Sequence, residues 1–164
     1  MVQIPQGLRS HEAARRPKVV IGWAEDVDLP EWGISCLRAK VDTGARTSAL
    51  HVEDLAVLAD GRVRFHVVVN RKHPRKPVAV CAPVVKWGRV RSSTGHYTMR
   101  CFVKTRVRIG NVEKIIEVSL VSREKMQYRM LLGRTALGKD FLVDVSKRHA
   151  LARKSIRKKK MRRP

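Results

Sequence analysis

The stretch Ala39–Leu50, AKVDTGARTSAL, contains an Asp-Thr-Gly triplet directly after an apolar segment. Gly44 allows a tight turn in which backbone N–H groups can hold the carboxylate of Asp42. Two such carboxylates that face each other and share one proton can activate a water molecule and polarise a peptide carbonyl. Asp and Gly are also frequent in ordinary turns, so the triplet alone is compatible with a structural Asx turn. Other parts of the sequence are needed to tell whether Asp42 is a catalytic residue or a turn residue.

The chain combines a normal apolar content with an extreme positive charge. Of its 164 residues, 43% are hydrophobic, which is typical of a folded domain and excludes a disordered basic chain. The formal net charge is +22, and ten Lys or Arg, with no Asp or Glu, fall within residues 147–164. Without these ten charges, residues 1–146 still carry +12. Such a cation is expected to bind nucleic acid, a membrane surface or an acidic peptide.

Cysteine, metal and membrane signals are weak in this chain. Cys36, Cys81 and Cys101 are single and widely spaced, which argues against a disulfide framework and fits a reducing cytosol. Neither Cys-x-x-Cys nor His-Glu-x-x-His occurs, so we predict no metal and no cofactor. The N-terminal residues lack an apolar signal-peptide core, and no apolar run approaches the roughly 20 residues of a membrane span. We therefore expect a cytoplasmic location and no membrane partner.

Short segments rich in β-branched residues, separated by turns, dominate the chain. Residues 1–17 are expected to form a flexible arm, residues 18–146 one folded domain, and residues 147–164 a basic tail that stays disordered until bound. Almost no helix is expected beyond one turn near the C-terminal end, so the pattern indicates a small β-barrel or sandwich. The segments expected to form strands are 18–30, 34–41, 62–69, 82–92, 97–109, 112–121 and 141–145, with a short segment and a loop over 45–61.

Two further segments accompany the Asp-Thr-Gly run in the order that retropepsins show. MLLGRTAL (130–137) lies near the C-terminal end, and the hairpin turn SSTGH (92–96) lies between, where a retropepsin places its mobile flap. With the longer runs AKVDTGARTSALHVEDL (39–55) and MQYRMLLGRTALGKDFLVD (126–144), the chain resembles the RimB-type proteins over about residues 19–146.

The resemblance implies an all-β fold: a small closed β-barrel of the retropepsin, or acid-protease, type with one short helix and a flap hairpin. It implies an aspartic-type peptidase in which Asp42 activates water while Thr43 and Gly44 shape the catalytic loop. The family is associated with a ribosomal-protein glutamate ligase, so the implied substrate is a poly-α-glutamate chain or a glutamate tail on a ribosomal protein. Its older label, ATP-dependent zinc protease, has no matching Walker A loop or ligand set here.

The basic residues near these motifs give the charge a possible purpose. A poly-glutamate chain carries one negative charge per residue, and a cleft lined by Lys and Arg attracts and orients it. Arg is the better clamp because its planar guanidinium contacts two carboxylate oxygens at once. The alternative is that most of these groups are solvated surface charges. The candidate substrate-binding residues are Lys40, Arg46, Ser48, Arg91, His96, Arg100, Arg129 and Arg134.

The number of Asp-Thr-Gly triplets bears on the oligomeric state. Only one occurs in the sequence, so a two-carboxylate site requires a homodimer with one Asp42 from each copy. Thr43 would then hydrogen-bond across the two copies and lock the loops together. In a monomer Asp42 would need another partner, for which Lys40, Arg134 and His96 are the candidates. We prefer the dimer.

Several residues depart from the expected pattern or stay open. Ala45 stands where many aspartic peptidases have Ser or Thr, so a hydroxyl bond to the carboxylate is missing. Thr98 occupies a flap position that is acidic in related sequences, which puts the role of that carboxylate in doubt. His51 and His96 are candidate ligands or bases, although such histidines more often satisfy local hydrogen bonds.

A second function class competes with the enzyme. The tail segment RKSIRKKKMRR (153–163) is typical of runs that neutralise phosphates, so the chain could be a non-catalytic module that binds ribosomal RNA or a ribosomal protein. No helix-turn-helix, zinc finger or aromatic stacking pair supports base recognition in the remaining sequence. The two classes also combine, because the tail could bring an enzyme to the ribosome.

Overall fold

The computed structural model describes most of the chain as strands joined by short turns. The predicted arm before residue 17, the tip of the predicted flap at 92–94 and the predicted tail beyond residue 151 lie outside the described residues. The described ranges are 17–69, 77–91 and 95–151. The elements are β1 (Val19–Gly22), β2 (Ala24–Leu29), the 3-10 turn η1 (Pro30–Trp32), β3 (Ile34–Val41), β4 (Ser48–His51), β5 (Glu53–Val57), β6 (Arg62–Val67), β7 (Val78–Pro83), β8 (Lys86–Arg91), β9 (Tyr97–Ile109), β10 (Val112–Val121), β11 (Met130–Leu132), α1 (Arg134–Leu137) and β12 (Phe141–Asp144).

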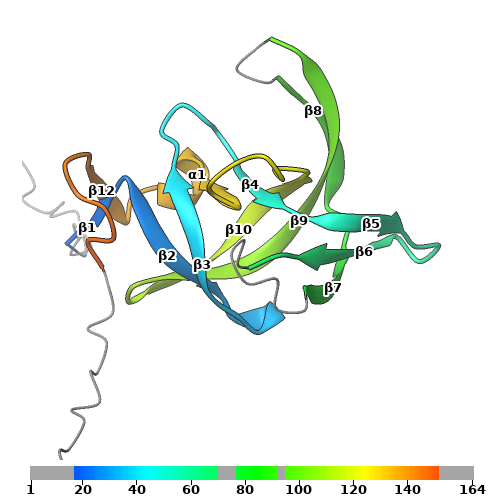
Figure 1. Ribbon diagram of the computed structural model, residues 1–164, viewed down its shortest axis with the longest axis horizontal. Helices are drawn as coiled ribbons and strands as arrows, with labels where there is room; N and C mark the ends of the chain where they lie inside the picture. Colours follow the sequence, from blue (N-terminus) through cyan, green and yellow to red (C-terminus); the bar gives the residue numbers. More distant parts are fainter. Residues whose placement is uncertain (1–16, 70–76, 92–94, 152–164) are drawn as a thin grey trace, which may run out of the picture.

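Six strands close into a β-barrel, which confirms the predicted fold class. The strand order is β10-β4-β11-β3-β2-β9, and pairing between β9 and β10 closes the ring. β9 extends past the barrel and pairs with β8, so the two form a long curved hairpin that arches away from the barrel wall (Figure 1). This hairpin stands where the sequence predicts the flap.

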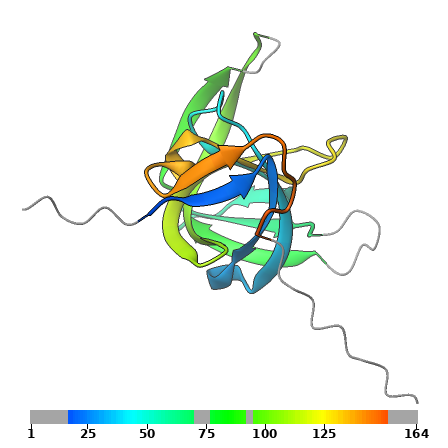
Figure 2. The ribbon, with the colours of Figure 1, turned by 90° about the vertical axis from the view of Figure 1, so that its left-hand side faces the viewer.

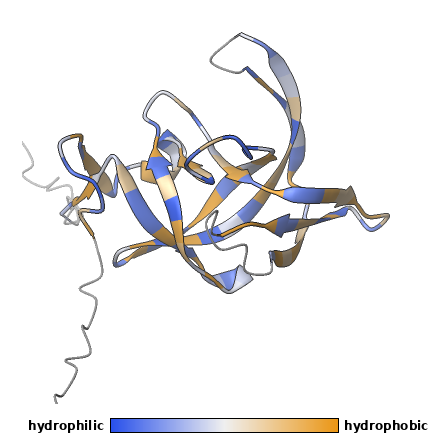
Figure 3. Ribbon diagram, in the orientation of Figure 1, coloured by the Kyte–Doolittle hydropathy of each residue, from blue (hydrophilic) through white to orange (hydrophobic). Residues whose placement is uncertain are grey.

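The barrel is filled because its strands alternate between buried apolar and exposed polar positions. In β3, Ile34, Leu37, Ala39 and Val41 are buried, while most of the residues between them are exposed. Figure 3 shows the same alternation of apolar and polar residues along the strands. A period of two places one face of each strand in the core, which is why the pattern identified these strands.

Two smaller sheets flank the barrel. β5, β6 and β7 form an antiparallel sheet of three strands, and β1 pairs in parallel with β12. Figure 2 shows β1 and β12 side by side at the end of the molecule nearest the viewer. The single strand predicted over 18–30 is wrong, because the chain bends at Trp23. Its N–H donates to the carbonyl of Lys147, and the N–H of Gly22 donates to Glu25 Oε1.

The short segment and loop predicted over 45–61, and the single strand predicted over 82–92, are also corrected. β4 and β5 lie in the first segment, and β4 escaped detection because all four of its residues are buried, leaving no alternation to read. β7 ends at Pro83 and β8 begins at Lys86, so the second segment contributes to two different sheets.

The first residues of the predicted tail pack against the folded body. The carboxylate of Glu25 is almost fully buried and accepts hydrogen bonds from the N–H groups of Ala150 and Leu151. The His149 N–H donates to the carbonyl of Ala24 at 2.8 Å. Residues 147–151 therefore belong to the ordered fold. Among the described residues, no helix has the length and apolar character needed to span a membrane.

Candidate active site

The Asp42 loop begins where β3 leaves the barrel. β3 runs parallel to β11, and the Asp42 N–H donates to the Leu132 carbonyl at 2.9 Å, which fixes the point of departure. The carboxylate then folds back onto its own turn, because Oδ1 accepts the N–H groups of Gly44 and Ala45, each at 3.1 Å. Among the described residues nothing donates to Oδ2, so one oxygen of a half-buried carboxylate is left for solvent or substrate.

The segment that carries the LLGRTAL motif (131–137) is hydrogen-bonded to this loop. The Arg134 N–H donates to the Ala45 carbonyl at 2.9 Å, and the Thr135 N–H donates to the Arg46 carbonyl at 3.0 Å. The Gly133 N–H donates to Ser48 Oγ at 3.2 Å, and Ser48 has no exposed surface. Ser48 was predicted to bind substrate; its burial corrects this, and its hydroxyl instead joins the two motifs.

The guanidinium of Arg134 also serves the loop. Its Nη1 donates to the carbonyls of Thr43 and Gly44, at 3.0 and 2.8 Å. These contacts hold the two residues that follow Asp42, while Thr43 itself is exposed. Arg134 is thus placed as a positioning residue for the Asp-Thr-Gly turn.

Replacement of Arg134 by Met should separate positioning from folding. We expect the Asp42 loop to lose its fixed conformation. For the peptide hydrolysis proposed below, kcat should fall on the order of 100-fold, because small displacements of a catalytic group are costly. The melting temperature should change by only a few degrees, because the side chain is exposed. Kinetics and thermal unfolding measured on the same samples test this, and Arg134→Lys should recover part of the activity through one of the two bonds. Full activity of Arg134→Met would show that the turn needs no such support.

A cleft of about 1190 Å³ opens between the Asp42 loop and the hairpin. Its walls come from the loop, the β8–β9 hairpin, the second half of β10 and the connection from β10 to β11. Three predicted substrate-binding residues, Arg46, Arg91 and Arg100, line this cleft together with Asp42. The hairpin thus stands opposite the catalytic candidate, as a flap would.

A second hollow of about 760 Å³ also reaches Asp42. Lys40 and Thr43 line it, so these predicted residues are near the carboxylate although they do not line the larger cleft. Trp23 and Tyr128 form an apolar wall of this hollow and meet edge to face, with ring centroids 6.0 Å apart. Asp42 and Arg123 line both hollows.

Two predicted residues do not join the site. Arg129 is only 8% exposed and its Nη1 donates to the Glu124 carbonyl at 3.4 Å, so it supports the connection between β10 and β11. His96 is exposed immediately before β9 and lines neither hollow. The structure therefore does not bring these two side chains to Asp42.

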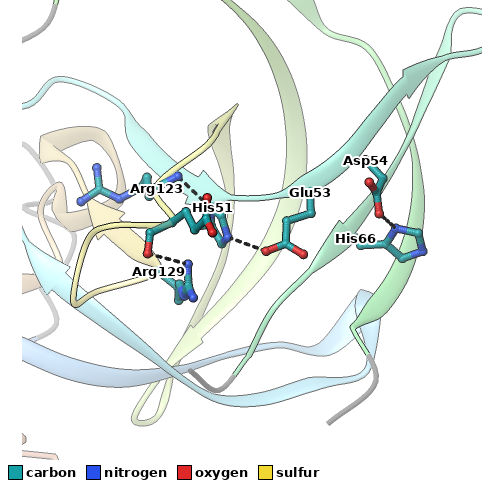
Figure 4. Close-up of polar contacts among 7 residues, drawn as sticks. His51, Glu53, Asp54, His66, Arg123 and Arg129 are labelled. Carbon is teal, nitrogen blue, oxygen red and sulfur yellow. Dashed lines mark hydrogen bonds and ion pairs between the residues drawn. The ribbon is translucent and has the colours of Figure 1, made fainter. Parts of the chain in front are cut away.

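Arg123 is, with Lys86 and Arg89, one of three basic cleft residues that the sequence did not reveal. It lies in the connection from β10 to β11, outside any motif, and reaches the cleft because that connection folds back beside the Asp42 loop. Its backbone N–H donates to His51 Nδ1 at 2.7 Å and its Nε to the Tyr128 carbonyl at 3.3 Å. Figure 4 shows its guanidinium extending away from the His51 ring.

His51 is a structural histidine at the end of β4. Its ring is fully buried, accepts the Arg123 N–H through Nδ1 and contacts Glu53 Oε1 through Nε2 at 3.3 Å (Figure 4). An accepting Nδ1 requires the neutral ring with its proton on Nε2. Burial, and next the charge of Arg129, lower the pKa of His51 below its ordinary value of 6.5. The geometry therefore gives His51 a local hydrogen-bonding role.

This histidine should make stability fall in mild acid. As the pH drops below about 6.5, the unfolded chain binds a proton that folded His51 resists, so unfolding becomes easier by at most about 1.4 kcal/mol per pH unit. His51→Asn keeps an acceptor near Nδ1 but does not titrate. Urea unfolding at pH 8 and pH 5 should therefore show a smaller loss for His51→Asn than for the wild type. Equal losses would assign the acid sensitivity to other groups.

Comparison with known proteins places the fold and the family. The chain is 33% identical over 137 residues to a probable alpha-L-glutamate ligase of Desulfotalea psychrophila, covering 82% of this chain and 30% of that protein. A probable alpha-L-glutamate ligase of Shewanella pealeana is 33% identical over 143 residues, with coverage of 84% and 31%. The chain thus spans about a third of the length of these relatives.

A solved structure supports the same architecture. The crystal structure of a Legionella pneumophila protein of unknown function matches with a TM-score of 0.67 and 24% identity, covering 82% of this chain and 99% of that one. At this identity the likeness establishes the fold alone. Residues 20–154 match the RimB-like family, described as the retropepsin-like aspartic endopeptidase RimB. Since this match includes the barrel, the Asp42 loop and its support, the chain belongs to the RimB-like family of retropepsin-like proteins.

Proposed function

We propose that the protein is an aspartic-type peptidase that hydrolyses acidic peptides, with α-linked glutamate chains or glutamate tails on a ribosomal protein as substrates. One observation carries the proposal: Asp42 lines a cleft whose other charged groups are mostly cations. The acidic lining residues are Asp42 and Glu117, and Glu117 is paired with Lys86 at 2.6 Å. The basic lining residues are Arg46, Lys86, Arg89, Arg91, Arg100 and Arg123.

The reaction needs a base for water and an acid for the peptide. Asp42 takes a proton from water while the water oxygen bonds to the peptide carbonyl carbon, and a second, protonated carboxyl gives its proton to the carbonyl oxygen. When the tetrahedral intermediate collapses, Asp42 gives its proton to the leaving amine, the C–N bond breaks, and a hydroxyl of the intermediate returns its proton to the second carboxylate as the carbonyl re-forms. Two neighbouring carboxyls can share one proton in this way because they disfavour each other's ionisation.

The second carboxyl comes, in this proposal, from a second copy of the chain. The other carboxylate that lines the larger cleft, Glu117, is bound to Lys86 and lies on β10 rather than beside the loop. Thr43 and Gly44 are exposed at the edge of the site, which leaves the loop accessible to a symmetric partner. A homodimer with two Asp42 residues across its axis would complete the catalytic pair.

The relatives support the substrate class. Proteins named probable alpha-L-glutamate ligase contain, within one polypeptide, a stretch similar to this chain. By its name such a relative ligates alpha-L-glutamate, and a peptidase beside it would break the bonds that the ligation forms. We infer that the two activities act on a common product.

Hydrolysis of a synthetic hexa-α-glutamate by the purified chain of 164 residues tests the proposal. We expect release of shorter glutamate peptides, unchanged by a chelator, and little cleavage of hexa-α-glutamine, which has the same backbone without charge. A hexamer linked through the γ-carboxyl is a second control, because it keeps the charge and alters the scissile bond. If the folded chain does not cleave hexa-α-glutamate, the proposed activity is contradicted.

Binding to the ribosome is a second candidate role, favoured by the charge of the tail. The packed residues 147–151 show where a truncation should fall: after Leu151, so that the contacts of Glu25 survive. If the tail binds RNA, its removal should weaken binding to ribosomes and flatten the salt dependence, while peptidase activity persists. Unchanged ribosome binding by the truncated chain would contradict this role.

A further inference from the structure

Arg100 and Arg123 are among the cleft arginines that form no ion pair within the described part of the chain. Arg100, on the inner face of the hairpin, donates from Nε to Thr98 Oγ1 at 3.1 Å. Arg123 donates from Nε to the Tyr128 carbonyl at 3.3 Å. Neither forms an ion pair with a described Asp or Glu, and no described acceptor occupies their Nη atoms. The ends of both guanidinium groups therefore remain available.

Arg100, Arg123 and Asp42 line the same cleft, and the charge of Arg123 interacts with the charges of the other two. Burial lowers the pKa of Arg100. Burial, and next the charge of Arg100, lower the pKa of Arg123, while Asp42 raises it. Arg123 is thus repelled by the charge of Arg100 and attracted by that of Asp42. A further anion between them would be stabilised by both charges, since desolvated charges interact more strongly than charges in water.

The surroundings select the kind of anion. The same cleft presents Phe102, Met126 and the bare backbone of Gly88, so the cations are bordered by apolar surface. A glutamate side chain matches this arrangement, because its two methylene groups need apolar contact and its planar carboxylate fits the fork of a guanidinium. A phosphodiester is the rival ligand, since it also binds arginine, but it offers no aliphatic stem to these residues.

We propose that Arg100 and Arg123 together bind one side-chain carboxylate of the substrate beside Asp42, and thereby set the preference for glutamate next to the scissile bond. This inference rests on the proposed peptidase function and adds its specificity site. The two residues come from different walls of the cleft, one from the hairpin and one from the connection between β10 and β11. A bound carboxylate would therefore also tie the hairpin to the body of the molecule.

The binding experiment uses the Asp42→Asn chain, which should bind hexa-α-glutamate without turning it over. Titration calorimetry compares this background with the same chain carrying Arg123→Met. We expect a weakening of about 10- to 100-fold, the usual effect of losing a charge-assisted hydrogen-bonded pair. Arg123→Lys should fall between the two. Arg64→Met removes the same charge from an exposed position of β6, outside both hollows, and should leave affinity nearly unchanged.

The kinetic experiment reads specificity with Asp42 intact. Peptides with glutamate or glutamine beside the scissile bond are compared. Arg123→Met should lower kcat/KM for the glutamate peptide alone, so that the ratio of kcat/KM for the glutamate peptide to that for the glutamine peptide falls toward one. A fall for both peptides together would indicate a structural role and overturn the specificity site. Thermal unfolding of each variant, with Arg123→Lys as the conservative control, shows whether the fold is intact.

The outcomes separate this inference from the function on which it rests. Normal cleavage and binding of hexa-α-glutamate by Arg123→Met would overturn the carboxylate site and leave the peptidase standing. Absence of both cleavage and binding by the chain with Arg123 intact would overturn the two together. Displacement of bound hexa-α-glutamate by a short RNA at a lower concentration than by free glutamate peptide would assign the arginines to phosphate instead, and also overturn the proposal.

Discussion

Asp42→Asn is expected to lower kcat/KM for hexa-α-glutamate by about 10³-fold or more while the chain stays folded. The amide oxygen of Asn can still accept the N–H groups of Gly44 and Ala45, which Asp42 Oδ1 now accepts at 3.1 Å. The loop should therefore keep its shape, and the melting temperature should move by only a few degrees. What is lost is the ability to take a proton from water. Product analysis by chromatography and a thermal melt of the same sample measure both effects.

A mixing experiment with the same variant reports on the catalytic unit. With the amount of wild type fixed, an equal amount of Asp42→Asn chain is added and the subunits are allowed to exchange. If two copies build one site, random pairing leaves activity at about half of its starting value. A monomeric site would show no change. Retention of full activity by Asp42→Asn on its own would instead remove Asp42 from the mechanism.

The sequence predicted an all-β fold because strand information is local, and the resemblance to the RimB-type proteins implied a closed barrel rather than a sandwich. Residues of β3 and of the second half of β9, from Val103 to Ile109, alternate between buried and more exposed positions, and turn residues separate the strands, so the strands follow from a period of two. The Asp42 loop was also predictable, since the triplet and its glycine encode the turn that holds the carboxylate. The supporting motif at Gly133 was predicted from its resemblance to the second half of a retropepsin signature.

The residues that sequence reasoning missed or misplaced depend on contacts far apart in the chain. Arg123 has no motif, and its place beside Asp42 follows from the path of one connection and its bond to His51. Ser48 and Arg129 are polar residues near the motifs, and their chemistry suggested substrate contact. Burial decides otherwise for both, and burial at single polar positions is set by tertiary packing rather than by local pattern.

Gly133→Ala should be the most damaging substitution of a single methyl group in the site. The backbone of Gly133 is extended, with φ −81° and ψ 172°, which any residue adopts, so conformation does not require glycine here. Space does. A Cβ atom would lie 2.5 Å from the Thr47 carbonyl carbon, 2.6 Å from the Thr47 oxygen and 2.9 Å from the Arg46 oxygen. These are backbone atoms of the loop that follows Asp42, and they cannot rotate away as a side chain could.

The methyl group added by Gly133→Ala would therefore push the two motifs apart. The bonds from Gly133 N–H to Ser48 Oγ and from Arg134 N–H to the Ala45 carbonyl cross this contact and would weaken together. We expect a loss of about 1–3 kcal/mol in the free energy of unfolding, the usual cost of overpacking. Activity should fall further than stability, because the displaced loop carries Asp42. Urea unfolding and hydrolysis of hexa-α-glutamate measure the two losses.

Gly61→Ala supplies the matched control, because there the requirement is conformational and distant from the cleft. Gly61 has φ of 78°, and, its chain neighbours aside, no atom of the described residues lies within 4 Å of the position that its Cβ would take. An alanine in this turn should cost roughly 1 kcal/mol through backbone strain and leave hydrolysis unchanged. Each of the two variants gains one methyl group, but only Gly133→Ala displaces the Asp42 loop from the segment that contains residue 133. The two variants should therefore differ in activity. Equal activity in both would show that the contact between Gly133 and Thr47 does not position the catalytic carboxylate.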